Sequence, residues 1–512
     1  MVFSSSVFLM GFLPLFLLVY FLVPRRSAKN AVLFVASLLF YAWGEPFYVA
    51  LMLLSILLNW CAGLLMAAHP DRKKTVLALC LALNLFLLGF FKYEGFIADM
   101  LNGVLGMTVV SNLNLPLPIG ISFYTLQAIT YIVDVYRGKV EAQRNLLHLG
   151  MYIAMFPQLV AGPIVRYQTI CDQITSRKEN LRDFTAGARL FTIGLAKKVL
   201  LANVVAILAD NMLETGGPTI GLVGAWGGIV AFTFQIYFDF AGYSDMAIGL
   251  GKMCGFSYLR NFNYPYLSKS ITEFWSRWHI SLGTFFRDYL YFPLGGSRCS
   301  KRRWVLNLLV VWSLTGLWHG AAWNFVFWGL FNLVFLLFEK MVIGKALQRL
   351  PRAVCCCYTM LVVMTGLLLF WHEDLVKLWY YAKALLGCYG INGASSAWDT
   401  GVWAYLPIFI ICAFATTPLM PYIRARLVAW ARKVPVKNFM KEDLFAIGHS
   451  STVGLCDFDA YLSECHDAPS NWRVVVAKAA FAAADLALVV LLCASVAAIA
   501  AGSFNPFIYF RF

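Results

Sequence analysis

The feature that most constrains the fold of this chain is a succession of apolar segments, mostly about 17–25 residues long, separated by short loops rich in Lys and Arg. An α-helix of that length crosses roughly 30 Å of hydrocarbon, and the short alternating strands of a membrane barrel do not occur. Hydrophobic residues make up 61% of the 512 residues and charged residues only 13%, against roughly 25% charged residues in soluble domains. The sequence therefore predicts an all-α polytopic membrane protein, with residues 1–512 forming one domain.

The apolar segments predict about 11–12 membrane-spanning helices. They lie at 6–23, 30–43, 46–68, a segment ending near 92, a segment opening at 116, 185–209, 220–250, 304–318, 323–342, 354–371, 402–420 and 474–501. Two prolines and a glycine at 116–120 predict a broken or unevenly wound helix. Residues 151–165 are too short for a span and have basic loops on both sides, which predicts a re-entrant hairpin. Residues 251–303 are basic and aromatic, and predict amphipathic and re-entrant helices.

The net charge of +15 comes from Lys and Arg clustered in short loops, as the positive-inside rule expects of cytoplasmic loops, so we expect no nucleic-acid surface. Counting crossings from the basic loop after residue 23 places both termini outside, including the tail 503–512. Residues 424–441 are predicted as a basic cytoplasmic loop and residues 445–471 as a polar cytoplasmic insert. The Cys and His residues of that insert match no zinc-site spacing, so we expect no metal.

One imidazole, that of His319, lies between small residues and tryptophans at 315–325, in a long apolar region. An ionisable group inside a membrane is costly and is by default a functional-site hypothesis. A neutral imidazole can take a proton from a hydroxyl, and burial favours the neutral form. No GxSxG elbow or phosphate-binding loop occurs. His279 lies beside Arg277 on an expected amphipathic helix, which leaves a catalytic and a structural role open.

Six motifs in order resemble the membrane-bound O-acyltransferase family, in the bacterial branch of the alginate O-acetyltransferase membrane subunits. They are LPIGISFY at 117–124, FPQLVAGP at 156–163, FWSRWHISL at 274–282, FRDYLYFPLGG at 286–296, LWHG at 317–320 and NPFIYFRF at 505–512. The resemblance implies a helical ring around a central funnel. His319 matches the family's catalytic histidine, and His279 matches its second, upstream histidine.

The resemblance also implies an activity, in which an acyl group from a cytoplasmic thioester crosses the membrane for O-acetylation of an exported or cell-envelope polysaccharide. It implies acetyl-CoA as the donor and a bacterial cytoplasmic (inner) membrane as the location. Basic residues within 251–303, which include Arg277 and Arg287, can hold the CoA phosphates. No permanently bound cofactor is expected.

Acyl transfer also needs a hydrogen-bond donor for the oxyanion. Trp318, Asn324 and Tyr243 can each supply one, and the sequence does not choose among them. Asp239 and Tyr243 are spaced to share one face of the helix at 220–250, and we expect that face to point into the protein.

The tail suggests an acyl relay. By resemblance to polymer-acylating systems, Tyr509 would carry the acyl group to an extracytoplasmic acyltransferase of the SGNH type. A phenol leaves more readily than a sugar alkoxide, because its pKa is near 10. The alternative is that the aromatic residues of the tail anchor the helix end at the membrane interface.

Two other functions remain open from the sequence. One is D-alanyl transfer from a carrier-protein thioester, and the other is a polytopic glycan transporter or flippase. The transporter alternative predicts inverted repeats, and the sequence shows none.

Overall fold

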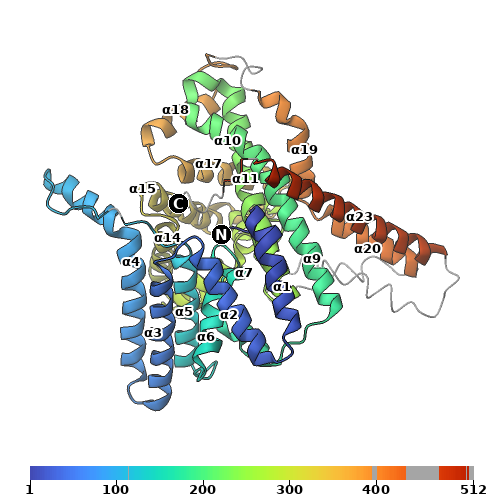
Figure 1. The fold of residues 1–512 in the computed structure, drawn as a ribbon. Helices are drawn as coiled ribbons and strands as arrows, with labels where there is room; N and C mark the ends of the chain where they lie inside the picture. The colour runs from blue at the N-terminus through green and yellow to red at the C-terminus, as the bar shows by residue number, and fades with distance from the viewer. Residues whose placement is uncertain (114, 395–400, 434–471, 503, 507–512) are drawn as a thin grey trace.

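The computed structural model describes residues 1–512 except 114, 395–400, 434–471, 503 and 507–512. Its described residues form helices and connecting segments, with no strand among them. In Figure 1 the helices of the first third of the chain stand side by side, and α17 and α18 lie above them. Two late helices, α20 and α23, lie together and extend away from the body (Figure 1).

The helices up to the long central one are α1 (Leu13–Leu22), α2 (Arg26–Ala42), α3 (Val49–Ala68), α4 (Lys73–Leu105), α5 (Ile121–Tyr136), α6 (Leu146–Ala154), α7 (Phe156–Leu159), α8 (Tyr167–Ser176), α9 (Leu181–Ala196), α10 (Asn203–Thr215) and α11 (Gly217–Met253). Those that follow are α12 (Ile271–Arg277), α13 (Ile280–Phe286), α14 (Lys301–His319), α15 (Trp323–Phe338), α16 (Gly344–Leu347), α17 (Arg352–Trp371), α18 (Leu375–Leu385), α19 (Leu406–Ala415), α20 (Leu419–Arg432) and α23 (Trp472–Ala500). Wider π-helical turns occur at Val7–Phe12, Lys197–Ala202, Arg287–Tyr291 and Glu339–Ile343. The turns at Pro265–Leu267 and Val402–Tyr405 are tighter, of the 3₁₀ type.

The polytopic helical membrane fold is confirmed, although fewer helices than expected are long and apolar enough to cross a membrane. Seven helices of the described chain meet that criterion, and the bent pair of α19 and α20 is an eighth candidate. Four predicted spans form helices that fall short of it. Val7–Leu22, α2 and α5 are shorter than 18 residues, and α14 begins with three consecutive cationic side chains.

Several predicted boundaries were wrong. The fourth helix does not end near residue 92 but continues to Leu105. The predicted irregularity at 116–120 precedes α5, which is regular from Ile121 onward. There Gly120 has a positive φ of 77°, and a Cβ on it would lie 2.7 Å from the backbone oxygen of Leu159. The predicted break is therefore a closely packed turn before α5, and this turn requires glycine at position 120.

The predicted start of the basic loop at residue 424 was also wrong, because α20 continues to Arg432, whereas residues 434–441 of that loop lie outside the described residues. Ala425, Val428 and Ala431 of α20 pack against Val474, Ala477 and Phe481 of α23. This contact buries the apolar face of α20, a segment that looks like a loop from its composition alone.

The segment predicted as a re-entrant hairpin lies deep inside the protein. Helices α6 and α7 meet at Met155, and every residue from 149 to 165 is buried. The long helix α11 passes beside this segment and packs closely against α9. A Cβ on Gly187 would lie 2.5 Å from the backbone oxygen of Gly249, and one on Gly194 would lie 2.5 Å from that of Gly242. Small residues of this kind allow helices to approach closely in membranes.

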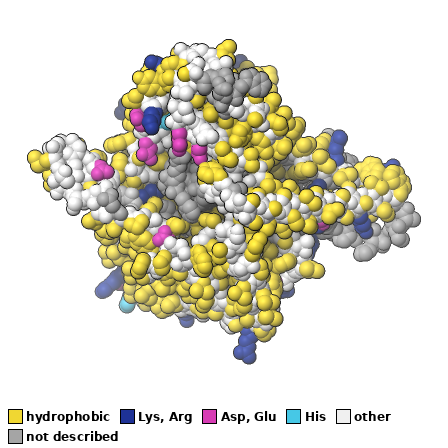
Figure 2. All heavy atoms as spheres, turned by 45° about the horizontal axis from the view of Figure 1, so that its top comes forward, with side chains coloured by type: hydrophobic (Ala, Val, Ile, Leu, Met, Phe, Trp, Pro, Cys, Tyr) yellow, Lys and Arg dark blue, Asp and Glu magenta, His cyan; other side chains and the backbone are white. Residues whose placement is uncertain are grey.

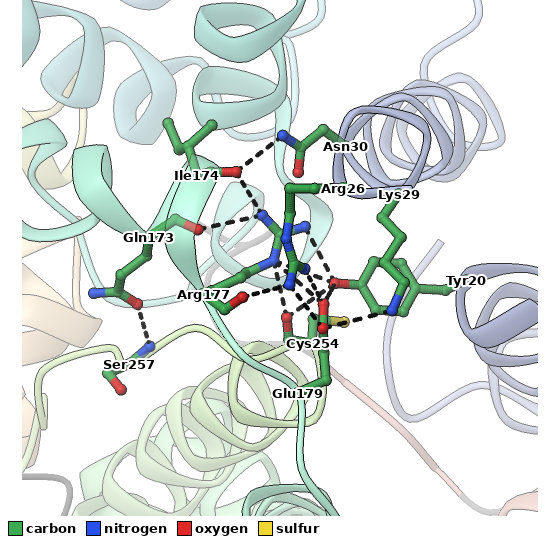
Figure 3. Close-up of polar contacts among 10 residues, drawn as sticks. All are labelled: Tyr20, Arg26, Lys29, Asn30, Gln173, Ile174, Arg177, Glu179, Cys254 and Ser257. Carbon is green, nitrogen blue, oxygen red and sulfur yellow. Dashed lines mark hydrogen bonds and ion pairs between the residues drawn. The ribbon is translucent and has the colours of Figure 1, made fainter. Parts of the chain in front are cut away.

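A polar cluster ties the first two helices to the loop between α8 and α9 (Figure 3). The buried guanidinium of Arg177 donates to the backbone oxygens of Ile174 and Cys254, and Arg26 forms an ion pair with Glu179. Burial alone would raise the pKa of the Glu179 carboxyl, but hydrogen bonds from Arg26 and Tyr20 lower it to about 2. The cluster therefore stays charged at neutral pH. It holds one end of the bundle together.

The outer surface is largely apolar, as a membrane-embedded protein requires. Figure 2 shows hydrophobic side chains over most of the visible face, with Lys and Arg mainly at its periphery. Large exposed side chains such as Leu22, Phe86 and Leu486 lie on α1, α4 and α23. Lipid contact removes this apolar surface from water.

Candidate active site

Both candidate histidines line one large cavity of about 640 Å³. His319 is the last residue of α14, and His279 directly precedes α13. A second, smaller cavity of about 60 Å³ also reaches His319 and is lined mainly by aromatic and aliphatic side chains from α11, α15 and α17. His319 therefore stands where a wide cavity with basic side chains in its lining meets a small apolar one.

The ring of His319 lies in a box of aromatic rings. Its centroid is 5.0 Å from the rings of Trp318 and Trp328 and 5.4 Å from that of Phe370, each in an edge-to-face arrangement. Within the described part of the chain, no hydrogen bond reaches the imidazole. The next residue, Gly320, must lack a side chain, because a Cβ there would lie 2.1 Å from the ring of Phe325.

The end of the helix that carries His319 is held from α4 by two residues that sequence reasoning missed. The hydroxyl of Tyr93 donates to the backbone oxygen of Leu317 at 2.7 Å, and the ammonium of Lys92 donates to that of Trp318. The ammonium also lies 5.8 Å from the Trp318 ring. A cation at a helix C-terminus is favourable, since the last carbonyls lack intrahelical partners. A lysine inside the apolar α4 segment was the available sequence signal.

The other histidine, His279, is held by hydrogen bonds. Its backbone is left-handed, with φ 46° and ψ 52°, and its side chain is only 3% exposed. The ring Nδ1 lies 3.2 Å from Oδ1 of the buried Asn261, and the ring of Phe240 meets the imidazole edge-on at 4.6 Å. Sequence reasoning did not identify Asn261, and an asparagine in an irregular segment carries no signal of such a role.

The short helix before His279 is fixed by a buried carboxylate. Glu339 accepts the backbone N–H groups of Ile271 and Thr272 at 2.5 and 3.0 Å, which are the first two of α12. The hydroxyl of Thr272 donates to the same carboxylate. A negative group at a helix N-terminus satisfies donors that have no partner within the helix. This contact fixes α12, and with it the chain that leads to His279.

Basic side chains gather along the large cavity. They are Arg166, Arg260, Arg277, Arg287 and Lys340. Two of the predicted substrate-binding residues belong to this set, and each has an acidic neighbour. Arg277 pairs with Glu273 at 2.8 Å, and Arg287 donates to Asp288 at 2.7 Å.

Asp288 moderates that positive charge and also pairs with Arg166 at 2.8 Å. Burial would raise the pKa of the Asp288 carboxyl, but hydrogen bonds from Arg287 and Arg166 lower it. The carboxylate therefore stays ionised and keeps both guanidinium groups oriented beside the cavity.

The four other predicted substrate-binding residues, Trp318 among them, line neither cavity. Asp239 forms a buried ion pair with Lys198 at 2.7 Å, and the ring of Tyr243 stacks on Phe3 at 4.5 Å. Asn324 donates to the backbone oxygen of Phe370 at 3.0 Å. Both Asp239 and Tyr243 point into the protein, as expected, Asp239 toward Lys198 and Tyr243 toward the N-terminal segment.

The remaining predicted oxyanion donor, Trp318, is adjacent to both histidines. Its ring centroid lies 6.0 Å from that of His279 and 5.0 Å from that of His319. The indole N–H is buried and donates to no atom of the described residues.

The two ends of the described chain meet at the Lys198–Asp239 pair. Lys198 donates to Asn203 at 2.8 Å and to the backbone oxygen of Pro506. Asn505 accepts from Asn203 at 3.1 Å and donates to the backbone oxygen of Ser4 at 2.8 Å. The proposed relay residue, Tyr509, lies outside the described residues, as does the insert at 445–471. In the part of the chain that is described, no group of three or more His, Cys, Asp or Glu side chains is arranged to hold a metal ion.

Comparison with known proteins identifies relatives of this chain. Residues 138–362, which include both histidines, match the membrane-bound O-acyltransferase family. The chain is 38% identical to probable alginate O-acetylases of Azotobacter vinelandii and Pseudomonas aeruginosa, over 100% of both sequences in each case. It is 34% identical to the peptidoglycan O-acetyltransferase of Helicobacter pylori, over 77% of this chain and 81% of that protein. It is 30% identical to the teichoic acid D-alanyltransferase of Bacillus subtilis, over 46% of this chain and 62% of the relative.

Proposed function

Because the chain belongs to the membrane-bound O-acyltransferase family, we propose that it moves an acetyl group from cytoplasmic acetyl-CoA across the bacterial inner membrane for O-acetylation of an exported or cell-envelope polysaccharide. The observation that carries this proposal is the position of His319. It lies at the junction of a basic-lined cavity and a small apolar one. The first suits the phosphates of CoA, and the second suits a short acyl group.

The donor site follows from the charges on the large cavity. Arg260 and Lys340 line it together with Arg166, Arg277 and Arg287, and guanidinium groups bind phosphate through paired hydrogen bonds. These residues come from segments that the positive-inside rule assigns to the cytoplasmic side. Acetyl-CoA would bind with its phosphates among them and its thioester toward His319.

The chemistry requires one base at the inner end of that cavity. In the proposed step, His319 takes the proton of the attacking hydroxyl as its oxygen bonds to the thioester carbonyl carbon. The carbon–sulfur bond then breaks, and the CoA thiolate leaves and takes the proton from the imidazolium. The indole N–H of Trp318, adjacent to both histidines, is the oxyanion donor that we favour among the predicted ones.

For the acceptor, we propose a relay through Tyr509 to an extracytoplasmic SGNH-type acyltransferase, which would complete transfer to the polymer. Support comes from Asn505 and Pro506, which are held inside the protein by Ser4, Asn203 and Lys198. The tail that follows therefore starts close to α11 and the N-terminal segment. On this proposal both termini lie on the extracytoplasmic side.

The two alternative functions that the sequence left open differ in their support. Membership of an acyltransferase family removes the transporter alternative. D-alanyl transfer from a carrier protein has weaker support, since similarity to the D-alanyltransferase covers 46% of the chain whereas similarity to the O-acetylases covers 100% or 77%.

The test is peptide mass spectrometry of the purified full-length protein after incubation with acetyl-CoA. We expect an acetyl group on Tyr509 in the wild type and none in His319→Ala, with equal thermal stability of the two proteins. Consumption of acetyl-CoA without an adduct would replace the relay by direct transfer. A wild-type protein that neither binds nor consumes acetyl-CoA would overturn the proposed donor, and a D-alanyl carrier-protein thioester would be the next substrate to assay.

A further inference from the structure

The hydrogen bonds around Asn261 determine which nitrogen of His279 carries the proton. Asn261 is 1% exposed, and its Oδ1 accepts the backbone N–H of Ser281 at 3.2 Å. A backbone N–H can only donate, so the atom facing it must be the amide oxygen. The amide nitrogen of Asn261 in turn lies 3.1 Å from the hydroxyl of Ser244. The orientation of the Asn261 amide is therefore fixed by its surroundings.

The Ser281 hydroxyl supports the same assignment. It accepts the backbone N–H of Ile164 at 3.0 Å, which leaves its own proton to donate to Asn261 Oδ1 at 2.9 Å. The oxygen of Asn261 thus receives hydrogen bonds only. His279 Nδ1 lies 3.2 Å from this same oxygen and 3.5 Å from the Ser281 hydroxyl, whose proton goes to Asn261 over the shorter distance, so Nδ1 carries the hydrogen. A neutral imidazole has one N–H, so its Nε2 is left with a lone pair.

That Nε2 atom has no hydrogen-bond partner among the described residues, although it is buried. His279 lines the large cavity together with His319, whereas Asn261 lines neither cavity. A buried polar atom without a partner is costly, and it points to a ligand that the folded chain does not itself supply.

We propose that Asn261 is a positioning residue that holds His279 in the tautomer with hydrogen on Nδ1. His279 thereby presents Nε2 to the cavity as a hydrogen-bond acceptor for the attacking hydroxyl. The inference rests on the proposed acyl transfer and assigns the two histidines different roles: His279 orients the hydroxyl, and His319 takes its proton. It also excludes neutral His279 as the donor that stabilises the oxyanion, because its single N–H is committed to Asn261.

The first arm of the test reads the tautomer without any substrate. Nitrogen NMR of full-length protein labelled at its seven histidines, compared with a His279→Gln sample, isolates the His279 signals. We expect a protonated Nδ1 and an unprotonated Nε2 in the wild type at pH 8. A protonated Nε2 would overturn the proposal whatever the activity. This arm stands even if acetyl-CoA proves to be the wrong donor.

The second arm compares kinetics with acetyl-CoA in three variants. Asn261→Leu removes the acceptor and should lower kcat roughly 10-fold, within the loss expected for removing the orienting imidazole itself, with the KM for acetyl-CoA unchanged. Asn261→Asp keeps an acceptor oxygen and should keep the Nδ1–H tautomer and recover most of the lost kcat. Ser244→Ala is the matched control, since it removes only the contact on the amide nitrogen, and should retain kcat.

Wild-type kcat in Asn261→Leu would overturn the positioning role, as would an equal loss in Asn261→Asp and Asn261→Leu. A loss confined to KM would also overturn it, because it would indicate donor binding. Should Asn261→Leu fail to fold, as judged by its thermal unfolding, the tautomer and kcat of Asn261→Asp decide the question. A wild-type protein without activity, but with the expected tautomer, would contradict only the proposed function.

Discussion

The ring of His319 touches three aromatic rings, whereas the ring of His279 is hydrogen-bonded through Nδ1 to a buried amide. Aromatic contacts restrict where an imidazole lies and leave both nitrogens able to gain or lose a proton. A hydrogen bond to a fixed acceptor holds one tautomer. One cavity can therefore contain a histidine suited to carrying a proton, His319, and another suited to orienting a substrate, His279.

The strongest test of the different roles assigned to the two histidines is to remove the base. His319→Gln keeps a polar side chain of similar size but cannot take up a proton at neutral pH. We expect the rate of acetyl transfer to fall about 1000-fold or more, within the range of general-base contributions, with thermal stability preserved. Transfer of radiolabelled acetyl groups from acetyl-CoA measures it, and a residual rate within tenfold of wild type would contradict the assigned role.

Replacing the second histidine should have a smaller effect. His279→Ala removes an acceptor that orients the hydroxyl, and we expect a loss of roughly 10–100-fold in kcat with the KM for acetyl-CoA nearly unchanged. The same assay measures it. A loss equal to that of His319→Gln would show that the two histidines act as one unit, and the distinction drawn between them would fail.

The aromatic box can be loosened without touching either histidine. Phe370→Leu removes one of the rings around His319 and should lower kcat about tenfold, which corresponds to about 1.4 kcal/mol, because the imidazole gains freedom. Phe335→Leu is the matched control, since Phe335 packs at a tilt against Phe331 and neither of these two residues lines a cavity. Equal kinetic effects from both variants would indicate a general packing defect, and thermal unfolding of each protein would show it.

The smallest effects are expected at the end of α14, where α4 holds the carbonyls that precede His319. Lys92→Met keeps the length of the side chain and removes a helix-terminal cation, and should cost up to about 2 kcal/mol of stability with a several-fold lower kcat. Tyr93→Phe removes one neutral hydrogen bond and should cost about 1 kcal/mol with little change in rate. Chemical unfolding and the acetyl-transfer assay measure the two quantities. A larger kinetic effect from Tyr93→Phe would contradict this order.

Much of the protein's nature could be predicted from the sequence because it depends on local composition. Apolar length decides membrane insertion, so the polytopic helical fold follows from the segments alone. His319 was recognisable because an imidazole in an apolar setting is rare and costly. The order of six short motifs indicated the acyltransferase family, which the comparisons confirm.

Which polar side chains face the cavity depends on how the helices pack. Helical spacing placed Asp239 and Tyr243 on one face of α11. Because α11 contacts other helices over most of its length, the spacing could not show whether that face meets His319 or the chain termini. The predicted boundary at residue 92 and the predicted loop at 424 failed because contacts between distant helices override local composition.

The partners of the two histidines come from elsewhere in the chain. Lys92 reaches a carbonyl 226 residues away in sequence, and Asn261 reaches a ring 18 residues away. Contacts of this kind form only when the helices are packed, because no residue near either histidine in the chain encodes them. Local composition and motif order are enough to identify His319 as a candidate base in a membrane acyltransferase fold. The packing of distant segments places His279 and His319 on one cavity and supplies what holds each ring.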